Sequence, residues 1–200
     1  MTMPAAAPRP ALFLDRDGVV NVNHGYVHRA EDTAFVPGIF ELCRSAQALG
    51  CALVIITNQA GIARGHYSAA QYHAYSGWLR GAMAAQGVLL DGIYHCPHHP
   101  EFGIGACRRA CACRKPAPGM ILQAARDLDL DLARSALLGD SVSDSEAGRR
   151  AGVGLLMLLS AGASAPPTPA ADVQTARDLA SARDTLQQWC ARQDRVPHMR

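Results

Sequence analysis

Four short apolar runs, at residues 11–14, 52–56, 136–138 and 154–159, constrain the fold more than any other feature of the sequence. The runs are apolar throughout rather than at alternate positions, which is typical of strands that are covered on both faces. Between them, residues 37–49, 68–83 and 118–128 carry apolar side chains at helical spacing. This alternation predicts an α/β fold, a Rossmann-like doubly wound parallel sheet.

The 200 residues and their ordinary composition favour one globular domain over residues 1–200. Within it, residues 1–10 and the Ala- and Pro-rich residues 161–171 are expected to be flexible, and residues 172–193 to be mostly a C-terminal helix. No apolar run approaches the roughly 20 residues that span a bilayer, and the N-terminal stretch lacks the apolar core of a secretory signal. We therefore expect a cytoplasmic protein without a membrane partner, of a size that suits a monomer.

Polar side chains follow three of the four runs, at the predicted carboxyl ends of the strands. Asp15-Arg16-Asp17-Gly18 follows the first, Thr57-Asn58-Gln59 the second and Gly139-Asp140 the third. Ligands of an open parallel sheet bind beyond these ends. Paired carboxylates suit Mg²⁺, whereas a hydroxyl and two amides donate hydrogen bonds to phosphate oxygens without carrying charge. Arg114-Lys115 adds two cations that would compensate the charge of a phosphate.

Each of these motifs also has an ordinary structural interpretation. An isolated Asp-x-Asp-Gly is typical of a turn, and Asn58 after a strand suits an Asx turn. Asp144 suits the cap of a helix over residues 146–150. The combination of an acid pair, a hydroxyl with amides, a base and a further acid, in this chain order, is more specific than any single motif.

A cluster of metal-binding residue types lies in the irregular segment 96–115. Cys96-x-His98 and Cys111-x-Cys113 are separated by twelve residues, and in an extended chain each pair shares one face. Four such ligands suit a tetrahedral Zn²⁺ with no open position, which would be structural. The alternative is a surface loop that carries unrelated thiols and imidazoles. The competing candidate ligands are His95, His99 and Cys107.

The chain order of these motifs resembles that of the haloacid dehalogenase (HAD) superfamily of phosphohydrolases. The four motifs of that superfamily match Asp15-x-Asp17, Thr57, Lys115 and Gly139-Asp140-x-x-x-Asp144. Within the superfamily, the sequence is similar to the heptose 1,7-bisphosphate 7-phosphatase family. This narrower similarity covers residues 11–160 and is carried by residues 15–18, 25–27, 57–65, 96–100 and 111–116.

The resemblance implies a Mg²⁺-dependent phosphatase that acts through an aspartyl-phosphate. Asp15 would be the nucleophile, and Asp17 the general acid and then the general base. Mg²⁺ would be held by Asp15, the backbone carbonyl of Asp17 and Asp140, while Thr57 and Lys115 would bind the phosphoryl oxygens. Asp144 would orient Lys115 or metal-bound water. The zinc ligands that the resemblance favours are Cys96, His98, Cys111 and Cys113, within a zinc loop over residues 96–113.

The substrate that the resemblance implies is D-glycero-D-manno-heptose 1,7-bisphosphate, which would lose its 7-phosphate in the synthesis of nucleotide-activated heptose for the lipopolysaccharide core. The segment between Asp17 and Pro37 is too short for a large cap domain, so short loops must select the substrate. Arg114 is a candidate anchor for the second phosphate, whereas His24 fits a solvated loop equally well. Ser141 stands where many relatives carry Lys. The expected substrate contacts are Asn23, His24, Gly25, Tyr26, Thr57, Asn58, Gln59, Ala60, Arg114, Lys115 and Ser141.

Three other functions compete with this one. Histidinol-phosphate phosphatases use similar motifs and a similar zinc loop. A phosphatase that acts on nucleic-acid ends is disfavoured, because the net charge is only +2 and no basic stripe is present. A zinc-clamped binding module on a phosphatase fold would have no need for the whole set of acidic, hydroxyl and basic residues at the strand ends. The preferred anomer of the heptose does not follow from the loop at residues 23–26 or from the zinc loop.

Overall fold

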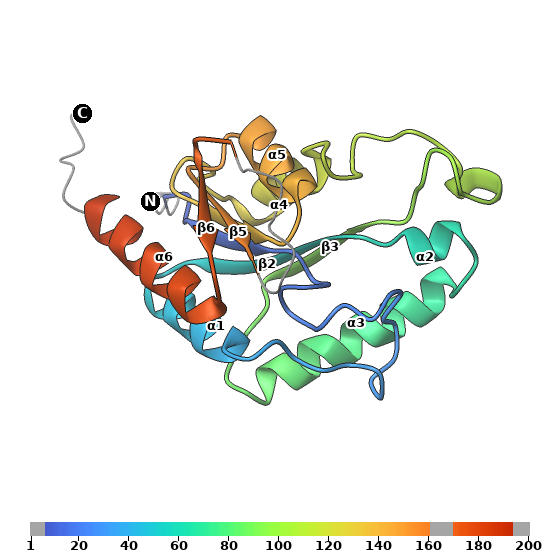
Figure 1. Ribbon diagram of the computed structural model, residues 1–200, viewed down its shortest axis with the longest axis horizontal. Helices are drawn as coiled ribbons and strands as arrows, with labels where there is room; N and C mark the ends of the chain where they lie inside the picture. Colours follow the sequence, from blue (N-terminus) through green and yellow to red (C-terminus); the bar gives the residue numbers. More distant parts are fainter. Residues whose placement is uncertain (1–6, 161–169, 194–200) are drawn as a thin grey trace, which may run out of the picture.

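Six parallel strands form one sheet in the order β3-β2-β1-β4-β5-β6 (Figure 1). The computed structural model describes residues 7–160 and 170–193. The predicted doubly wound parallel sheet is thereby confirmed. The strands are β1 (Ala11–Leu14), β2 (Ala52–Asn58), β3 (Gly92–Cys96), β4 (Ala136–Gly139), β5 (Leu155–Leu159) and β6 (Val173–Ala176).

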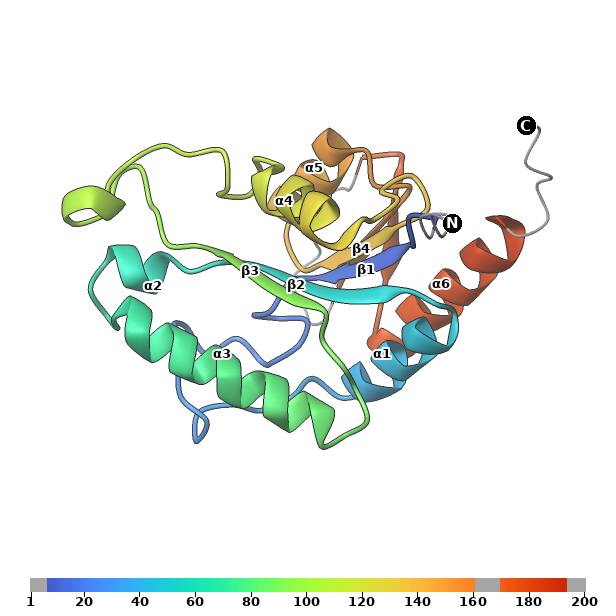
Figure 2. The same ribbon diagram turned by 180° about the vertical axis from the view of Figure 1, so that it is seen from behind.

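Helices cover both faces of this sheet, as Figures 1 and 2 show from opposite sides. One face is covered by α1 (Ile39–Ala48), α3 (Ala69–Ala84) and α6 (Leu179–Gln193), and the other by α4 (Gly119–Leu128) and α5 (Val142–Ala151). Two short elements complete the fold, α2 (Ala60–Ala63) and a 3₁₀ turn at Gly105–Cys107. Ser68 caps α3, because its hydroxyl accepts a hydrogen bond from the Gln71 backbone N–H while its own N–H donates to the Gln71 side chain.

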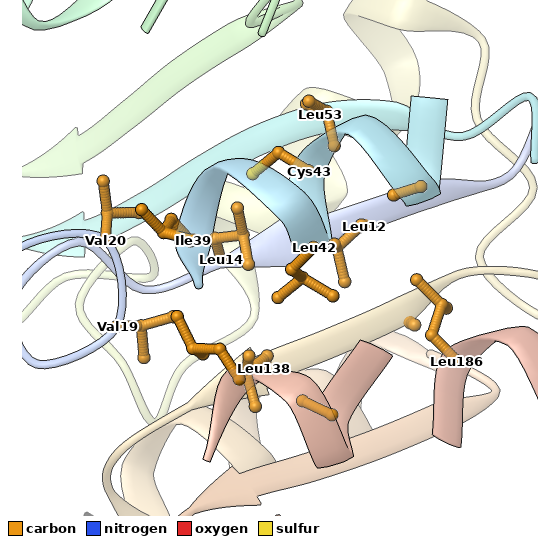
Figure 3. Close-up of a cluster of buried hydrophobic side chains, with 14 of the residues drawn as sticks. Leu12, Leu14, Val19, Val20, Ile39, Leu42, Cys43, Leu53, Leu138 and Leu186 are labelled. Atoms are coloured by element: carbon orange, nitrogen blue, oxygen red, sulfur yellow. The ribbon is translucent and has the colours of Figure 1, made fainter. Parts of the chain in front are cut away.

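The two apolar cores follow from the alternation of side chains along the strands. In β1, Leu12 and Leu14 point to the face that α1, α3 and α6 cover, whereas Phe13 points to the face of α4 and α5. Figure 3 shows the first of these cores, in which Leu42 of α1 and Leu186 of α6 pack beside the strand side chains. Burial on both faces accounts for the continuous apolarity of the central strands.

The strand order brings the polar strand ends together. β1 lies in the middle of the sheet and pairs with β2 on one side and β4 on the other. After β3 the chain crosses over β1 to continue on the opposite side, which makes the carboxyl end of β1 a topological switch point. The segments that follow β1, β2 and β4 therefore meet at one edge of the sheet.

Two strands of the sheet, β3 and β6, were not predicted from the sequence. The helix expected over most of residues 172–193 is confirmed as α6, which has 15 residues, and β6 precedes it and pairs with β5. Val173-Gln-Thr-Ala176 is short, and its two central residues are both exposed, so it has neither the apolar run nor the alternation of the other strands. β3, Gly-Ile-Tyr-His-Cys, was missed because it is the edge strand and its central positions are only partly buried.

The two segments expected to be flexible lie mostly outside the described residues, which begin at residue 7 and omit 161–169. Within the described part of the first segment, the Arg9 backbone bonds to Asp129 and Asp131, and Pro10 accepts a bond from Ala52. Residues 15–38, between β1 and α1, form a loop without a large cap. Among the helices of residues 7–160 and 170–193, none is both long and apolar enough to cross a membrane.

Candidate active site and metal-binding cluster

Three carboxylates lie together at the ends of β1 and β4. Asp15, Asp140 and Asp144 each place one oxygen within 4.8 Å of the others. Burial, together with the neighbouring carboxylates and against the attraction of Lys115, raises the pKa of Asp15 to about 7. Burial and then Asp144 raise the pKa of Asp140 to about 6. Carboxylate oxygens that repel one another in this way fit a hard divalent cation such as Mg²⁺, which would offset their negative charge.

Gly18 is what allows Asp140 to enter this cluster. A Cβ atom built on Gly18 would lie 1.9 Å from Oδ2 of Asp140, and Gly18 has φ +92, a conformation that other residues rarely adopt. Gly139 plays the same part for Asp144, whose Cβ would lie 2.2 Å from a Cβ at position 139. Both glycines of the strand-end motifs therefore make room for a carboxylate.

Lys115 is the buried cation of the site. Its side chain is 3% exposed, and Nζ lies 2.8 Å from Oδ1 of Asp15 and pairs with Oδ1 of Asp144. Nζ also donates to the carbonyl of Ile56 at 3.1 Å. Burial acts against the charged amine, but the two carboxylates prevail and raise the pKa of Lys115. Asp144 also accepts bonds from the N–H and hydroxyl of Ser141 at the start of α5, so it both orients Lys115 and caps the helix.

Asp17 lines the same pocket, is not a member of this cluster of three and is held by donors. The Arg16 guanidinium, which is 1% exposed, reaches both oxygens of Asp17 through Nη2 at 2.8 and 2.7 Å. Nδ2 of Asn21 and Nε2 of Gln59 donate to the same carboxylate at 3.1 and 3.3 Å. With Nε of Arg16 at 3.2 Å, five donating contacts from three side chains hold this carboxyl group in one position.

The last two residues of β2 have different roles, one in the pocket and one in its support. Thr57 is buried and lines the pocket, and its Oγ1 accepts a bond of 2.8 Å from Gln59. Asn58 bonds twice to the backbone of Lys115, accepting from its N–H at 3.0 Å and donating to its carbonyl at 3.1 Å. Asn58 therefore fixes the main chain that carries the buried cation.

A pocket of about 320 Å³ opens over these residues. It contains most of the predicted site but neither His24 nor Arg114. His24 lines a neighbouring pocket with His28 and His66, and Nη1 of Arg114 donates to the carbonyl of His98 at 3.1 Å. The pocket lining is Asp15, Asp17, Asn23, Gly25, Tyr26, Thr57, Asn58, Gln59, Ala60, Gly61, Tyr67, Lys115, Asp140, Ser141 and Ser143.

Three lining residues were missed by the sequence analysis: Gly61, Tyr67 and Ser143. Tyr67 packs directly over Gly61, where a Cβ would lie 2.2 Å from its ring. The only sequence signal for this contact was a glycine inside the Thr57–Gly65 motif. Ser143 lies in the first turn of α5, and its hydroxyl is 2.8 Å from that of Ser141.

The four predicted zinc ligands come together in space. The Sγ atoms of Cys96, Cys111 and Cys113 are 3.2–3.5 Å apart, and Nδ1 of His98 lies 3.7 Å from Sγ of Cys96. A tetrahedral Zn²⁺ with bonds of about 2.3 Å places its thiolates about 3.8 Å apart, close to these separations. Cys107, His95 and His99 are not part of this cluster of four. The residues present therefore fit a structural zinc ion.

Backbone bonds fasten the zinc loop to the segment after β2. At its base, the Gln59 N–H donates to the carbonyl of Cys96 at 2.8 Å. At its tip, the Ile104 N–H donates to the carbonyl of Ala63 at 2.8 Å. The Arg64 guanidinium also lies 4.7 Å from the centre of the Phe102 ring. The loop is thus attached beside the pocket at the candidate zinc ligand Cys96 and also at Phe102 and Ile104, which are not ligands.

Comparison with known proteins gives a consistent result. A family model described as "HAD-hyrolase-like" matches residues 112–183. The chain is 52% identical to a D-glycero-alpha-D-manno-heptose-1,7-bisphosphate 7-phosphatase of Burkholderia mallei over 149 residues, which are 74% of this chain and 79% of that protein. The chain belongs to the HAD-like phosphatases.

Relatives acting on the other anomer and a solved structure extend this comparison. A D-glycero-beta-D-manno-heptose-1,7-bisphosphate 7-phosphatase of Escherichia coli is 45% identical to this HAD-like phosphatase, over 82% of this chain and 84% of the relative. The crystal structure of the D,D-heptose 1,7-bisphosphate phosphatase of B. bronchiseptica, complexed with magnesium and phosphate, has a TM-score of 0.75 and 32% identity. It matches over 90% of this chain and 98% of that one.

Proposed function

We propose that this HAD-like phosphatase removes the 7-phosphate from D-glycero-D-manno-heptose 1,7-bisphosphate. The observation that carries the proposal is the convergence of Asp15, Lys115 and Asp140 with Thr57 in one pocket at the switch point of the sheet. The names of the curated relatives support the sugar, and the magnesium and phosphate in the related structure support the chemistry. The product would enter the synthesis of nucleotide-activated heptose for the lipopolysaccharide core.

In the first step, Asp15 attacks the phosphorus atom. Its Oδ1 is engaged by the Arg16 N–H at 2.7 Å and by Lys115, so we assign the attack to Oδ2. A bond forms between Oδ2 and phosphorus while the bond to the sugar oxygen breaks, and Asp17 gives that oxygen a proton. Thr57 and Lys115 bind the phosphoryl oxygens as charge develops on them.

In the second step, water cleaves the aspartyl-phosphate. Asp17, now ionised, takes a proton from the water, whose oxygen bonds to phosphorus as the bond to Asp15 breaks. Inorganic phosphate leaves, and both carboxylates return to their starting state. The bonds from Arg16, Asn21 and Gln59 keep the Asp17 carboxyl group in position for this proton transfer.

Two metal sites complete the proposal. We assign Mg²⁺ to Asp15, Asp140 and the backbone carbonyl of Asp17; when bound, it neutralises charge on the transferred phosphoryl group. Asp144 is not assigned as a Mg²⁺ ligand, because it pairs with Lys115 and accepts a hydrogen bond from Ser141 at the start of α5. We assign Zn²⁺ to Cys96, His98, Cys111 and Cys113, where it would hold the loop that leads into Arg114 and Lys115.

Substrate selection falls to short loops. Asn23, Gly25, Tyr26 and Ala60 line the pocket mouth and would contact the sugar. We keep Arg114 as the anchor for the second phosphate, which requires its side chain to leave the carbonyl of His98. The reduced thiols of the zinc cluster fit a cytoplasmic enzyme, and we propose that the single domain acts as a monomer without nucleic-acid or membrane partners.

The test is phosphate release with Mg²⁺ from both anomers of the heptose bisphosphate, from other sugar bisphosphates and from histidinol phosphate. The proposal predicts that a heptose bisphosphate is preferred. It also predicts that Asp15→Asn abolishes turnover and that Asp17→Asn slows the first step and stalls the second. Preference for histidinol phosphate would reassign the substrate. Failure to release phosphate from every compound would instead favour a zinc-clamped binding module.

A further inference from the structure

We infer that Gln59 and Tyr67 form a positioning pair that aims the Thr57 hydroxyl proton at the transferred phosphoryl group. This inference rests on the proposed function, since Thr57 would bind phosphoryl oxygens. The sequence predicts a direct substrate contact for Gln59. The structure instead shows its side chain 2% exposed and engaged at both ends by protein groups.

Asp17 determines which way the Gln59 amide faces. Oδ2 of Asp17 accepts a bond of 2.7 Å from Nη2 of Arg16, so the Gln59 atom that lies 3.3 Å from the same oxygen is assigned as a second donor. That atom is therefore the amide nitrogen. The amide oxygen then faces Tyr67, whose hydroxyl donates to it.

The same amide nitrogen determines whether the Thr57 hydroxyl acts as donor or acceptor toward Gln59. Nε2 of Gln59 has two hydrogens, one directed to Asp17 and one to Oγ1 of Thr57 at 2.8 Å. Because Oγ1 accepts this bond, the Thr57 hydroxyl keeps its own proton for another acceptor. Thr57 lines the pocket, so this proton is available to a phosphoryl oxygen, as a transition-state donor must be.

Tyr67 fixes the orientation of the Gln59 amide through its bond to Oε1. Its ring is 4% exposed, packs over Gly61 and stacks on His28, with ring centroids 4.5 Å apart and an angle of 16°. The hydroxyl therefore has a fixed position from which to donate to Oε1 of Gln59. Rotation of the amide by 180° would break this bond and set Oε1 against the carboxylate of Asp17.

The substitution Gln59→Glu tests the direction of these bonds with almost no change of shape. An ionised carboxylate at position 59 has no hydrogen to give, so Thr57 would turn its proton toward that carboxylate and away from phosphate. We expect kcat/KM to fall about 100-fold at pH 8. The ratio of variant to wild-type kcat/KM should rise as the pH falls, because the introduced carboxyl group, once protonated, again donates one bond. In Gln59→Leu the corresponding ratio should stay low and independent of pH.

Tyr67→Phe is the second variant and Tyr75→Phe is its control. Both tyrosines are 4% exposed, but the Tyr75 hydroxyl bonds to Oγ1 of Thr33 at 3.0 Å, outside this chain of bonds. We expect kcat to fall about three- to tenfold in Tyr67→Phe and to stay unchanged in Tyr75→Phe. Similar thermal unfolding of the two variants would show that the difference is not one of folding.

Binding of inorganic phosphate in Mg²⁺, followed by titration calorimetry, separates this inference from the choice of sugar. Weaker phosphate binding by Gln59→Glu than by the wild type is expected whatever sugar the enzyme prefers. If the wild type fails to hydrolyse heptose bisphosphate while this difference persists, the proposed substrate is wrong and the positioning pair stands. Unchanged phosphate binding together with a pH-independent activity ratio in Gln59→Glu would overturn the positioning pair.

Discussion

Replacing the nucleophile should make the magnesium-free protein more stable while abolishing turnover. Asp15 is buried beside Asp140 and Asp144, and its pKa is about 7 instead of the ordinary 3.8. A carboxyl whose pKa is raised by folding binds more protons in the folded than in the unfolded state. It therefore causes the stability to fall as the pH rises from about 4 to about 7.

The size of this effect follows from the difference between the two pKa values. At about 1.4 kcal/mol per unit, ionising Asp15 in the folded protein costs about 4 kcal/mol at pH 8. Asp15→Asn removes this cost, and the Asn carbonyl still accepts the bonds that now reach Oδ1 from the Arg16 N–H and Lys115. For a chain of this length, we expect the melting temperature to rise by about 8–16 °C.

Thermal unfolding at pH 5 and pH 8, on zinc-loaded protein with and without Mg²⁺, measures this effect. The gain in Asp15→Asn should be full at pH 8 without Mg²⁺, smaller at pH 5, and smaller again when Mg²⁺ neutralises the wild-type site. Asp17→Asn is the control of opposite sign, because it removes the negative charge and one of the two oxygens that face the buried Arg16. An Asp15→Asn variant no more stable than the wild type at pH 8 without Mg²⁺ would refute the reasoning.

Three further predictions concern other parts of the molecule. Gly18→Ala should push the Asp140 carboxylate aside and weaken Mg²⁺ binding at least tenfold in a metal titration of activity. Removal of zinc under saturating Mg²⁺ should raise KM and speed hydrogen exchange over residues 97–110; unchanged kinetics in verified zinc-free protein would contradict this. Ser68→Ala should cost about 1 kcal/mol in urea unfolding, from the lost cap of α3, with kcat unaltered.

The central sheet and most of the pocket followed from the sequence, because both depend on local pattern. Strands covered on both faces are apolar throughout, as in Ala52–Ile56, and polar residues directly after them must lie at the carboxyl edge. The edge strand β3 escaped prediction because its Tyr94 and His95 are only partly buried. Its position in the sheet, rather than its composition, makes it a strand.

The supporting contacts of the site depend on tertiary structure and were not predictable from spacing. Tyr67 enters the pocket because Gly61 leaves room for its ring, and Gln59 turns inward because Asp17 needs a donor. Arg114 directly precedes Lys115 in the sequence, yet its guanidinium bonds to a zinc-loop carbonyl while Lys115 lies in the carboxylate cluster. Adjacency in the chain gave no information on which of the two cations faces the reacting group.

The two hydrogen bonds between the Asn58 side chain and the Lys115 backbone have a consequence for protein engineering. Together with the cluster at Cys111 and Cys113, it fixes the end of the zinc loop where it enters the site, while Cys96 and His98 fix its beginning. The intervening residues 99–110 are anchored at both ends and supply no member of the carboxylate cluster. Because both ends are held independently, we expect a change confined to residues 99–110 that keeps the Ile104–Ala63 bond to leave Lys115 beside Asp15.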